Sequence, residues 1–277
     1  MQTSTIAIIG AGNMGTSLLG GLIANQFPAS QLWITDPDSE KLHVLEQQFN
    51  IQTALHNNDA VNAADVIILA VKPQMIANVM KEIAISVQTK KTLVISVAAG
   101  IRIDALQNGL GNSIPIVRCM PNTPALIRAG VTAMYANSLV TDKQRDLAES
   151  ILRAVGMVVW LEDEKLMDAV TALSGSGPAY FFLMIEALQH AGETLGLPRE
   201  TARLLTLQTA LGAARMAFET DVEANELCRR VTSKGGTTEA ALRVLENGQL
   251  RDLFLDALKA AKARSEELAE LFGKEVK

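Results

Sequence analysis

A glycine-rich turn near the start of the chain offers the strongest pattern for chemistry. Residues 8–15 read Ile-Ile-Gly-Ala-Gly-Asn-Met-Gly and follow a short apolar run. Such a Gly-x-Gly-x-x-Gly turn, placed between a strand and a helix, binds the pyrophosphate of a dinucleotide. Gly10 permits the tight turn, Gly12 lets the backbone approach the phosphates, and Gly15 lets the helix pack closely. Free N–H groups at the helix start would face the phosphates. The alternative is a tight turn without a ligand.

Asp36 and Lys72 carry charges that could complete such a site. Asp36 lies about 20 residues beyond the turn, where a carboxylate can accept hydrogen bonds from an adenosine ribose. Its charge would repel a 2′-phosphate, which favours NAD over NADP. Alternatively, residues 36–38 (DPD) form a turn that caps a helix. Lys72, within residues 70–73 (AVKP), could meet a cofactor phosphate or ribose, or it could be a solvated surface lysine.

Two further segments place small or polar groups directly after apolar runs. Residues 97–100 (VAAG) are small enough for a flat ring or a ribose to approach the backbone. Asn122, in the rigid loop 121–124 (PNTP), could hydrogen-bond a carboxamide. Ligands of doubly wound sheets bind outside the carboxyl ends of the strands. Together these segments therefore predict one crevice along one sheet edge.

The second half of the chain has two segments rich in small residues. Residues 174–178 (SGSGP) suit helix capping and close packing. Residues 231–238 (VTSKGGTT) combine hydroxyls, a lysine and a glycine pair just before a helix. Successive glycines expose backbone N–H groups, so this segment is a candidate anion site. An ordinary capped helix start is the alternative.

Residues that usually act as nucleophiles or metal ligands are scarce. The 277 residues include three His and two Cys, Cys119 and Cys228. That spacing fits neither a zinc knuckle nor a disulfide framework, and two free thiols suit a reducing compartment. We therefore predict no metal site. In an enzyme with this composition, something other than a protein nucleophile or a metal would have to supply the reactive group.

Short apolar runs that alternate with amphipathic stretches position these motifs in the first half. We expect strands at Thr5–Ile9, Gln31–Thr35, Asp65–Ala70, Thr92–Val97, Pro115–Met120, Gly130–Tyr135 and Met157–Leu161. Helices are expected from the glycine turn to Asn25 and at Lys41–Gln48, Pro73–Val87 and Thr141–Ala154. Strands that alternate with helices indicate a doubly wound α/β domain. Continuous β-branched runs such as residues 65–70 indicate strands covered on both faces.

The pattern changes after about Asp163, beyond which no convincing period-two run occurs. Helices are expected at Pro178–Leu195, Pro198–Phe218, Thr237–Glu246 and Leu250–Phe272. The first is apolar over most of its circumference, so it must be buried. It could form the core of its own domain or an interface with a second chain; the pattern favours neither. We predict domains at residues 1–162 and 163–277.

Composition and charge exclude several other classes of protein. The net charge is −5, and no basic patch suggests nucleic-acid binding. No Lys or Arg precedes the first apolar run, which glycines interrupt, so it does not resemble a signal peptide. No apolar stretch approaches the roughly 18–20 residues of a membrane span. We expect a cytoplasmic protein without a membrane partner.

Six motifs together resemble the pyrroline-5-carboxylate reductase family. They are Ile9–Gly15 (IGAGNMG), Ala70–Pro73 (AVKP), Val97–Gly100 (VAAG), Val117–Pro124 (VRCMPNTP), Asp168–Tyr180 (DAVTALSGSGPAY) and Val231–Leu242 (VTSKGGTTEAAL). The first is common to many dehydrogenases, whereas the last two are specific. The resemblance covers essentially the whole length.

The resemblance implies the last step of proline biosynthesis, in which NADPH or NADH reduces 1-pyrroline-5-carboxylate to L-proline. It implies an N-terminal Rossmann-type doubly wound sheet followed by an all-α dimerisation domain. The family's helical domain builds an intertwined homodimer, and dimers gather into larger rings such as a decamer. For residues 178–195, the resemblance therefore implies the interface.

Site residues also follow from the resemblance. It implies that Thr238 hydrogen-bonds the ring nitrogen and that Ser233 and the N–H groups around Gly236 and Thr237 hold the substrate carboxylate. Glu164 and Asp221 match positions near the substrate pocket. The cofactor-binding set predicted from motif and resemblance together is Ile9, Gly10, Gly12, Asn13, Met14, Gly15, Asp36, Asn57, Ala70, Lys72, Pro73, Val97, Ala98, Ala99 and Asn122.

Asp36 departs from the family pattern, in which many members have Ser or Asn. Members commonly use NADPH, so the resemblance favours NADPH, whereas the carboxylate favours NADH. One alternative is another enzyme of the β-hydroxyacid dehydrogenase and imine reductase group, in which a catalytic Lys or Asp replaces the 233–238 loop. A redox sensor that binds a dinucleotide without turnover is the other.

Overall fold

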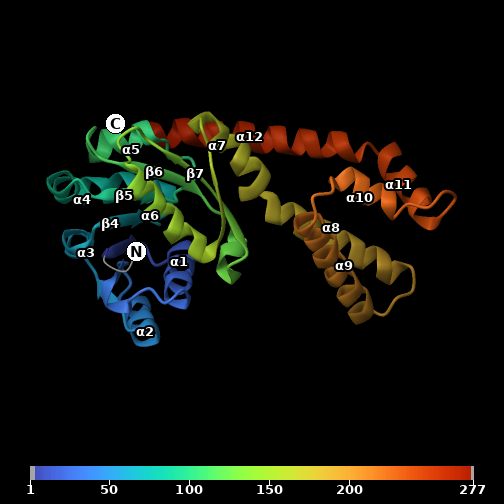
Figure 1. The fold of residues 1–277 in the computed structure, drawn as a ribbon, viewed down its shortest axis with the longest axis horizontal. Helices are drawn as coiled ribbons and strands as arrows, with labels where there is room; N and C mark the ends of the chain where they lie inside the picture. The colour runs from blue at the N-terminus through green and yellow to red at the C-terminus, as the bar shows by residue number, and fades with distance from the viewer. Residues whose placement is uncertain (1–3, 276–277) are drawn as a thin grey trace. The chain divides into compact units, whose positions relative to one another are not determined.

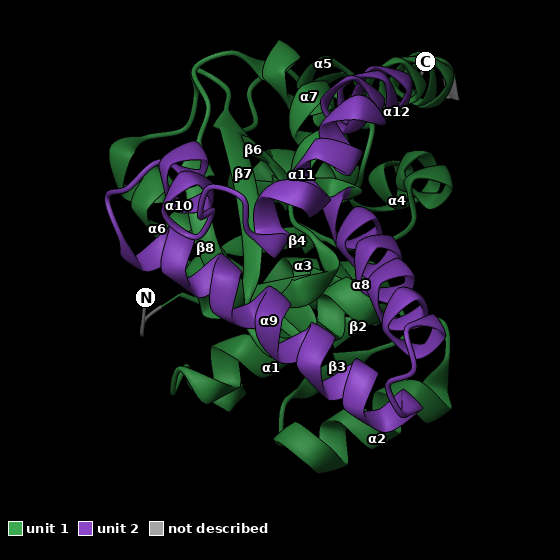
Figure 2. Ribbon diagram, turned by 90° about the vertical axis from the view of Figure 1, so that its right-hand side faces the viewer, with its two compact units in different colours: residues 1–176, 261–277 green, residues 177–260 purple. Residues whose placement is uncertain are grey.

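The computed structural model describes residues 4–275, and contacts divide the chain into two compact units. Unit 1 comprises residues 1–176 and 261–277, and unit 2 comprises residues 177–260 (Figure 2). By its contacts, the stretch 163–176 belongs with unit 1. The predicted functional boundary between residues 162 and 163 stays a prediction.

Unit 1 contains a sheet of eight strands in the order β3-β2-β1-β4-β5-β6-β7-β8. Neighbouring strands are parallel except for β6 and β7, which pair antiparallel. The order reverses direction at β1, as in doubly wound folds. The strands are β1 (Ile6–Ile9), β2 (Leu32–Thr35), β3 (Gln52–Ala54), β4 (Val66–Leu69), β5 (Leu93–Ser96), β6 (Ile116–Met120), β7 (Gly130–Ala136) and β8 (Gly156–Trp160).

Helices cover both faces of the sheet and create two hydrophobic cores (Figure 1). One core joins the sheet to α1 (Asn13–Ala24), α2 (Ser39–Phe49) and α6 (Asp142–Leu152). The other joins it to α3 (Asn57–Ala63), α4 (Ile76–Lys90) and α5 (Ile103–Leu110). Every residue of the central strands β1 and β4 is buried, which explains their continuous Ile, Val and Leu content.

Local signals set the helix ends. The Asp38 side chain accepts hydrogen bonds from the N–H groups of Glu40 and Lys41 and so caps α2, as the DPD turn predicted. Thr141 and Gln144 form a capping box at the start of α6. Pro73 begins a 3₁₀ turn that leads into α4, which places proline where its missing N–H costs no hydrogen bond.

A short segment after β8 packs against the sheet and then leads into unit 2. It contains α7 (Met167–Val170) and a π-helical turn over residues 171–175. Asp168 and Ser265 are buried, and the Ser265 hydroxyl donates to the Asp168 carboxylate over 2.7 Å. Ser265 belongs to α12 (Leu250–Glu275), whose second half returns to unit 1.

Within unit 2, every regular element that the structure describes is a helix. These are α8 (Gly177–Thr194), α9 (Arg199–Glu219), α10 (Ala224–Arg230), α11 (Thr237–Asn247) and the first part of α12. The predicted fold class, a doubly wound α/β sheet followed by an all-helical part, is therefore confirmed. The short elements β3, α3, α5, α7 and α10 did not stand out from the sequence.

Unit 2 has almost no core within one chain. The only buried residue of α8 is Gly177, and the only one of α9 is Ala202. On α8, the side chains of Phe181, Phe182 and Leu183 are 62%, 64% and 65% exposed. An apolar helix this exposed is not stable as the surface of a monomer.

Across residues 4–275, no helix combines the length and the apolar character that a membrane crossing requires.

Candidate functional site

The glycine turn adopts the shape that the sequence predicts. Gly10 has a φ of 104°, and a Cβ there would lie 2.9 Å from the carbonyl oxygen of Ala70. A Cβ on Gly15 would collide with the carbonyl oxygen of Gly10, so this glycine permits close packing of α1 on the turn. At Gly12 a Cβ would meet nothing within 4 Å, and no side chain caps α1. The N-terminus of α1 therefore presents open backbone to a ligand.

A pocket of about 410 Å³ lies at the carboxyl ends of β1, β4 and β5. Its lining consists of Gly12, Asn13, Met14, Ala70, Val71, Lys72, Pro73, Val97, Ala98 and Ala99. Three of the predicted motifs, which are far apart in the sequence, thus meet in one crevice, whereas Asn122 of the 121–124 loop is not among its lining residues. Val71 is the lining residue that the sequence argument did not name, although it lies inside the AVKP motif.

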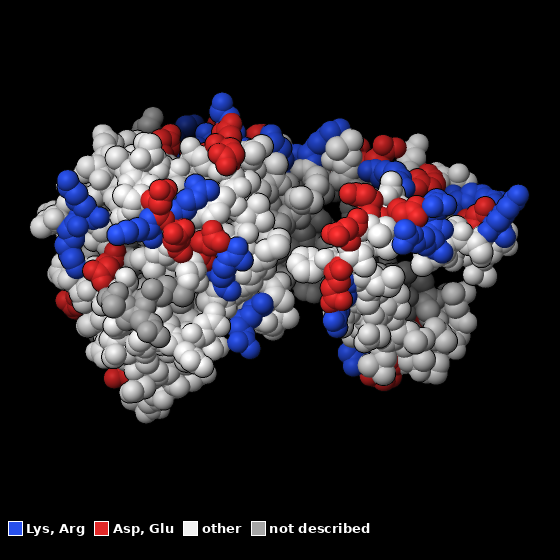
Figure 3. Space-filling view, viewed as in Figure 1, with Lys and Arg blue, Asp and Glu red and all other residues white. Residues whose placement is uncertain are grey.

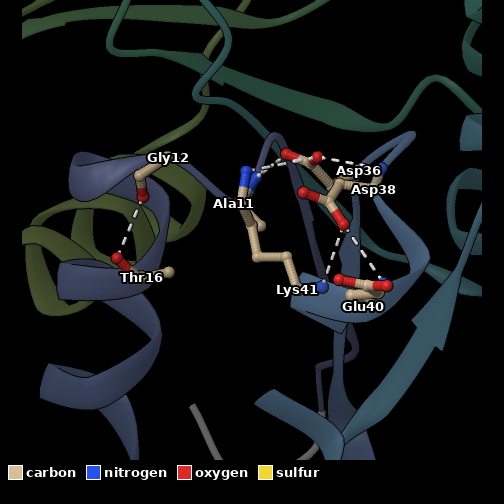
Figure 4. Close-up of polar contacts among 7 residues, drawn as sticks. All are labelled: Ala11, Gly12, Thr16, Asp36, Asp38, Glu40 and Lys41. Carbon is tan, nitrogen blue, oxygen red and sulfur yellow. Dashed lines mark hydrogen bonds and ion pairs between the residues drawn. The ribbon is translucent and has the colours of Figure 1, made fainter. Parts of the chain in front are cut away.

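Asp36 is part of the wall that supports the glycine turn (Figure 4). Its Oδ2 atom accepts a hydrogen bond of 2.9 Å from the Ala11 N–H. Its Oδ1 atom accepts from the Asp38 N–H at 3.2 Å and forms an ion pair with the Lys41 ammonium group at 3.4 Å. Asp36 therefore both bonds to the turn and carries a negative charge beside it, with Lys41 as a neighbouring positive charge.

Two predicted cofactor residues have other surroundings. The Ile9 side chain is buried, and its carbonyl oxygen accepts from the Ala70 N–H. The Asn57 amide donates to Glu82 over 2.7 Å and accepts from the Thr35 hydroxyl over 2.6 Å. These contacts leave the cofactor roles of Ile9 and Asn57 as predictions.

Asn122 fastens the loop after β6. Its amide nitrogen donates to the Ser174 carbonyl oxygen, and its amide oxygen accepts from the Val131 N–H. The side chain thus joins β7 to the SGSGP segment. Both ends of the amide have a partner within the chain, so a contact with a carboxamide stays a prediction.

Glu164 lies against the sheet of unit 1. Its Oε1 atom accepts a hydrogen bond of 2.9 Å from the Ile103 N–H and pairs with the Arg118 guanidinium at 2.8 Å. Arg118 is 4% exposed and Glu164 is 23% exposed. These contacts join the start of α5 to β6. The position of Glu164 near the substrate pocket, which the resemblance implies, stays a prediction.

The predicted substrate loop forms a tight turn before α11 in unit 2. The Gly236 N–H donates to the Ser233 carbonyl oxygen, and no side chain caps α11. A Cβ on Gly236 would lie 2.5 Å from the Ser233 hydroxyl oxygen, so glycine keeps this hydroxyl close to the helix start. The hydroxyls of Thr237 and Thr238 have no hydrogen-bond partner among the described residues. The N–H of Gly236 is occupied, which leaves those of Thr237 and Thr238 as donors.

Glu239 adds a carboxylate that the sequence argument overlooked. Its Oε2 atom accepts a hydrogen bond of 2.7 Å from the N–H of Gly235, which has a φ of 75°. One backbone donor of the loop is therefore occupied by an internal anion. The remaining predicted substrate residue, Asp221, is exposed after the end of α9.

The described residues offer little protein-based reactivity. They contain no group of three His, Cys, Asp or Glu side chains arranged to hold a metal. Cys119 is buried in β6, and burial raises the pKa of its thiol far above the usual range.

Charges of both signs are interspersed on the face in Figure 3. The glycine turn, the open start of α1 and Lys72 do fit the pyrophosphate of a dinucleotide.

Two family models match successive parts of the chain. Residues 5–100 match "NADP oxidoreductase coenzyme F420-dependent", and residues 164–268 match "Pyrroline-5-carboxylate reductase dimerisation". The first match covers the glycine turn and pocket, and the second covers unit 2 with the segment before it.

Relatives and solved structures cover almost the entire chain. A pyrroline-5-carboxylate reductase of Pseudomonas aeruginosa is 50% identical, over 99% of this chain and 100% of the relative. The structure of a pyrroline-5-carboxylate reductase from Coxiella burnetii is 48% identical with a TM-score of 0.93, covering 96% and 98% of the two chains. That of a Plasmodium falciparum pyrroline carboxylate reductase, with NADP bound, is 30% identical with a TM-score of 0.86, covering 97% and 99%.

The doubly wound sheet and the glycine-lined pocket at its switch point define a dinucleotide-binding oxidoreductase of the Rossmann type. The 50% identity to the Pseudomonas aeruginosa relative, over 99% of this chain, narrows this class to one family. The chain belongs to the pyrroline-5-carboxylate reductase family.

Proposed function

We propose that this protein reduces 1-pyrroline-5-carboxylate to L-proline with NADPH as the preferred donor, as the last step of proline biosynthesis. The observation that carries the proposal is the coexistence, in one chain, of a dinucleotide pocket and the glycine-threonine loop at the start of α11. The relatives that match over the full length carry the name of this activity.

The reaction transfers one hydride to the substrate and takes up one proton. When bound, the dinucleotide would supply the hydride that the carbon of the cyclic C=N bond accepts, and it would be left oxidised. The ring nitrogen takes up one proton, which comes from water, so the imine becomes a secondary amine. Protein nucleophiles are not needed, which is consistent with the scarcity of His and Cys. Proximity and orientation can contribute on the order of 7–11 kcal/mol in favourable cases.

Each part of the chain then has a defined task. Backbone N–H groups at the start of α1, together with Lys72, would hold the pyrophosphate, and Val97–Ala99 would lie beside the nicotinamide half. In unit 2, Ser233 and the Thr237 N–H hold the substrate carboxylate. The Thr238 hydroxyl, which has no partner among the described residues, hydrogen-bonds the ring nitrogen. Asp221 stays a candidate for contact with the substrate, and Glu164 stays a candidate for a position near the substrate pocket.

The preference for NADPH depends on the charges beside the glycine turn. The charge of Asp36 disfavours a 2′-phosphate. The Lys41 ammonium group lies 3.4 Å from the Asp36 carboxylate, and because the Lys41 side chain is exposed, it can pair with a phosphate. A relative in the family has NADP bound. NADH remains the alternative donor.

We infer that the functional unit is a homodimer formed through the helical half, residues 163–277. The support is the missing core of unit 2: α8 and α9 each bury a single residue. A second copy of the chain would cover the exposed Phe and Leu side chains of the first copy. Assembly of dimers into a ring such as a decamer, in the cytoplasm, completes the proposal.

NADPH oxidation at 340 nm with 1-pyrroline-5-carboxylate tests the activity, with NADH measured in parallel. Substrate-dependent oxidation is expected, with a higher kcat/KM for NADPH than for NADH. Oxidation no faster than the substrate-free background with either cofactor would exclude the reductase. Sedimentation of the full chain tests the assembly, where a monomer would contradict the dimer.

A further inference from the structure

The loop between β5 and α5 forms one wall of the dinucleotide pocket. Val97, Ala98 and Ala99 line the pocket, and the loop ends at Ile103, the first residue of α5. Asp36 follows β2, on the opposite side of β1 from β5. A dinucleotide whose adenosine lies at Asp36 therefore places its nicotinamide half beside this loop.

Beyond the hydrogen bond from the Val97 N–H to the Leu69 carbonyl oxygen, three contacts hold this loop within unit 1. The Ala98 N–H approaches the Ser96 hydroxyl oxygen at 3.4 Å. Gly100, with a φ of 76°, packs closely beneath Phe272 of α12, since a Cβ there would lie 3.3 Å from the ring. Glu164 accepts the hydrogen bond from Ile103. Of these three contacts, the one made by Glu164 involves an ionised group.

The contact made by Glu164 is favoured by its electrostatic surroundings. Its carboxylate lies at the N-terminus of α5, where the helix dipole favours a negative charge. Arg118, buried on β6, pairs with the same oxygen atom and fixes the carboxylate in place. Since β6 lies between β5 and β7 in the sheet, this arrangement attaches the end of the loop to an interior strand of unit 1.

We propose that Glu164 is a positioning residue for hydride transfer, which acts by holding the 97–103 loop through Ile103 rather than by touching substrate or cofactor. The inference rests on the reductase activity proposed above. Glu164 then governs how precisely the nicotinamide lies against the imine carbon. The adenosine half, on the other side of β1, is insensitive to it.

The sharpest test deletes one hydrogen-bond donor and keeps both charged groups. Ile103→Pro removes the N–H that Glu164 binds, and proline suits the first position of a helix. The preceding residue, Arg102, has a φ of −80° and a ψ of 158°, which a residue before proline adopts readily. Ile103→Ala is the matched control, because it keeps the N–H and removes more of the buried side chain than proline does.

Ile103→Pro should lower kcat about tenfold to a hundredfold below that of Ile103→Ala, on the scale for small misplacements of reacting groups. The Kd of 2′-phospho-ADP-ribose, which lacks the nicotinamide, should be the same in both variants when measured by calorimetry. Equal kcat values would overturn the proposal. A matching loss of affinity for the fragment would also overturn it, because the whole pocket would then depend on Ile103.

A second pair of variants tests the proposal if the Ile103→Pro variant does not fold. Glu164→Gln keeps an oxygen that can accept from Ile103, whereas Glu164→Ala removes it. We expect Gln to restore most of the kcat that Ala loses, with thermal unfolding measured for both. Similar kcat values in the two Glu164 variants, both folded, would exclude the positioning role.

The wild-type assay separates this inference from the proposed function. If the wild type does not oxidise NADPH with the imine, the reductase proposal fails. The effect of the Glu164–Ile103 hydrogen bond on the loop is then measured by amide hydrogen exchange over residues 97–103. Faster exchange in Ile103→Pro than in Ile103→Ala supports it, and equal exchange excludes it.

Discussion

The carboxylate of Asp36 and the backbone N–H of Ala11 form a hydrogen bond of 2.9 Å that connects the end of β2 to the glycine turn (Figure 4). The sequence presented a ribose-binding carboxylate and a helix-capping DPD turn as alternatives. Asp38 caps α2, whereas Asp36 supports the glycine turn, and its contact with a ribose stays a prediction.

Replacement of Asp36 separates its charge from its hydrogen bond. Asp36→Asn keeps an oxygen acceptor for Ala11 and removes the charge. We expect it to shift the KM ratio towards NADPH by about tenfold or more, since one charge interaction near a protein surface is worth about 1–4 kcal/mol. Asp36→Ala also removes the acceptor, so KM should rise for both cofactors relative to Asp36→Asn. Steady-state kinetics with NADH and NADPH measure both effects; an unchanged ratio in Asp36→Asn would show that the carboxylate does not discriminate.

Periodic apolar runs and glycine spacing predicted the sheet and the crevice. Runs such as residues 65–70 left few alternatives to a buried strand, and the three pocket motifs each follow a strand end. The contacts of Asn57, Asn122 and Glu164 could not be predicted in this way, because each of these residues has a partner 22 to 61 positions away in the sequence. Spacing along the sequence carries no information about such pairs of polar groups.

Loss of the Thr238 hydroxyl should slow the chemical step. Thr238→Ala is expected to lower kcat about tenfold to a thousandfold, the scale for removal of a positioned donor or hydrogen bond. Thr238→Ser keeps a hydroxyl and should retain much of the activity. Thr237→Ala is the matched neighbour: it keeps the backbone N–H, so its kcat should fall far less. The three variants are compared by kcat at saturating NADPH, and an unchanged kcat in Thr238→Ala would remove Thr238 from the mechanism.

Glu239 should weaken substrate binding through its charge. Its carboxylate accepts from Gly235 in the loop that is proposed to hold the substrate carboxylate, so two anions compete for one set of donors. Glu239→Gln keeps an acceptor for Gly235 and removes the charge. We expect KM for the imine to fall a few-fold, in line with an exposed charge interaction of about 0.2–1 kcal/mol, while KM for NADPH stays constant. Raising the salt concentration should reduce the difference between the variant and the wild type. A KM for the imine that rises or stays the same would contradict this role.

The exposed apolar surface of α8 should determine the oligomeric state. Phe181→Lys combined with Leu183→Lys replaces two side chains that are 62% and 65% exposed in one chain. If a second copy buries them, their loss should weaken dimerisation by about a hundredfold or more, because each large apolar side chain contributes roughly 1.5–3 kcal/mol on burial. Ile85→Lys on α4, where the side chain is 80% exposed in unit 1, is the matched control and should leave the dimer intact. Sedimentation velocity across a concentration series gives the dissociation constants. A double variant that stays as dimeric as the control would show that α8 does not form the interface. Dissociation confined to the α8 variant would instead explain why so apolar a helix has no core of its own.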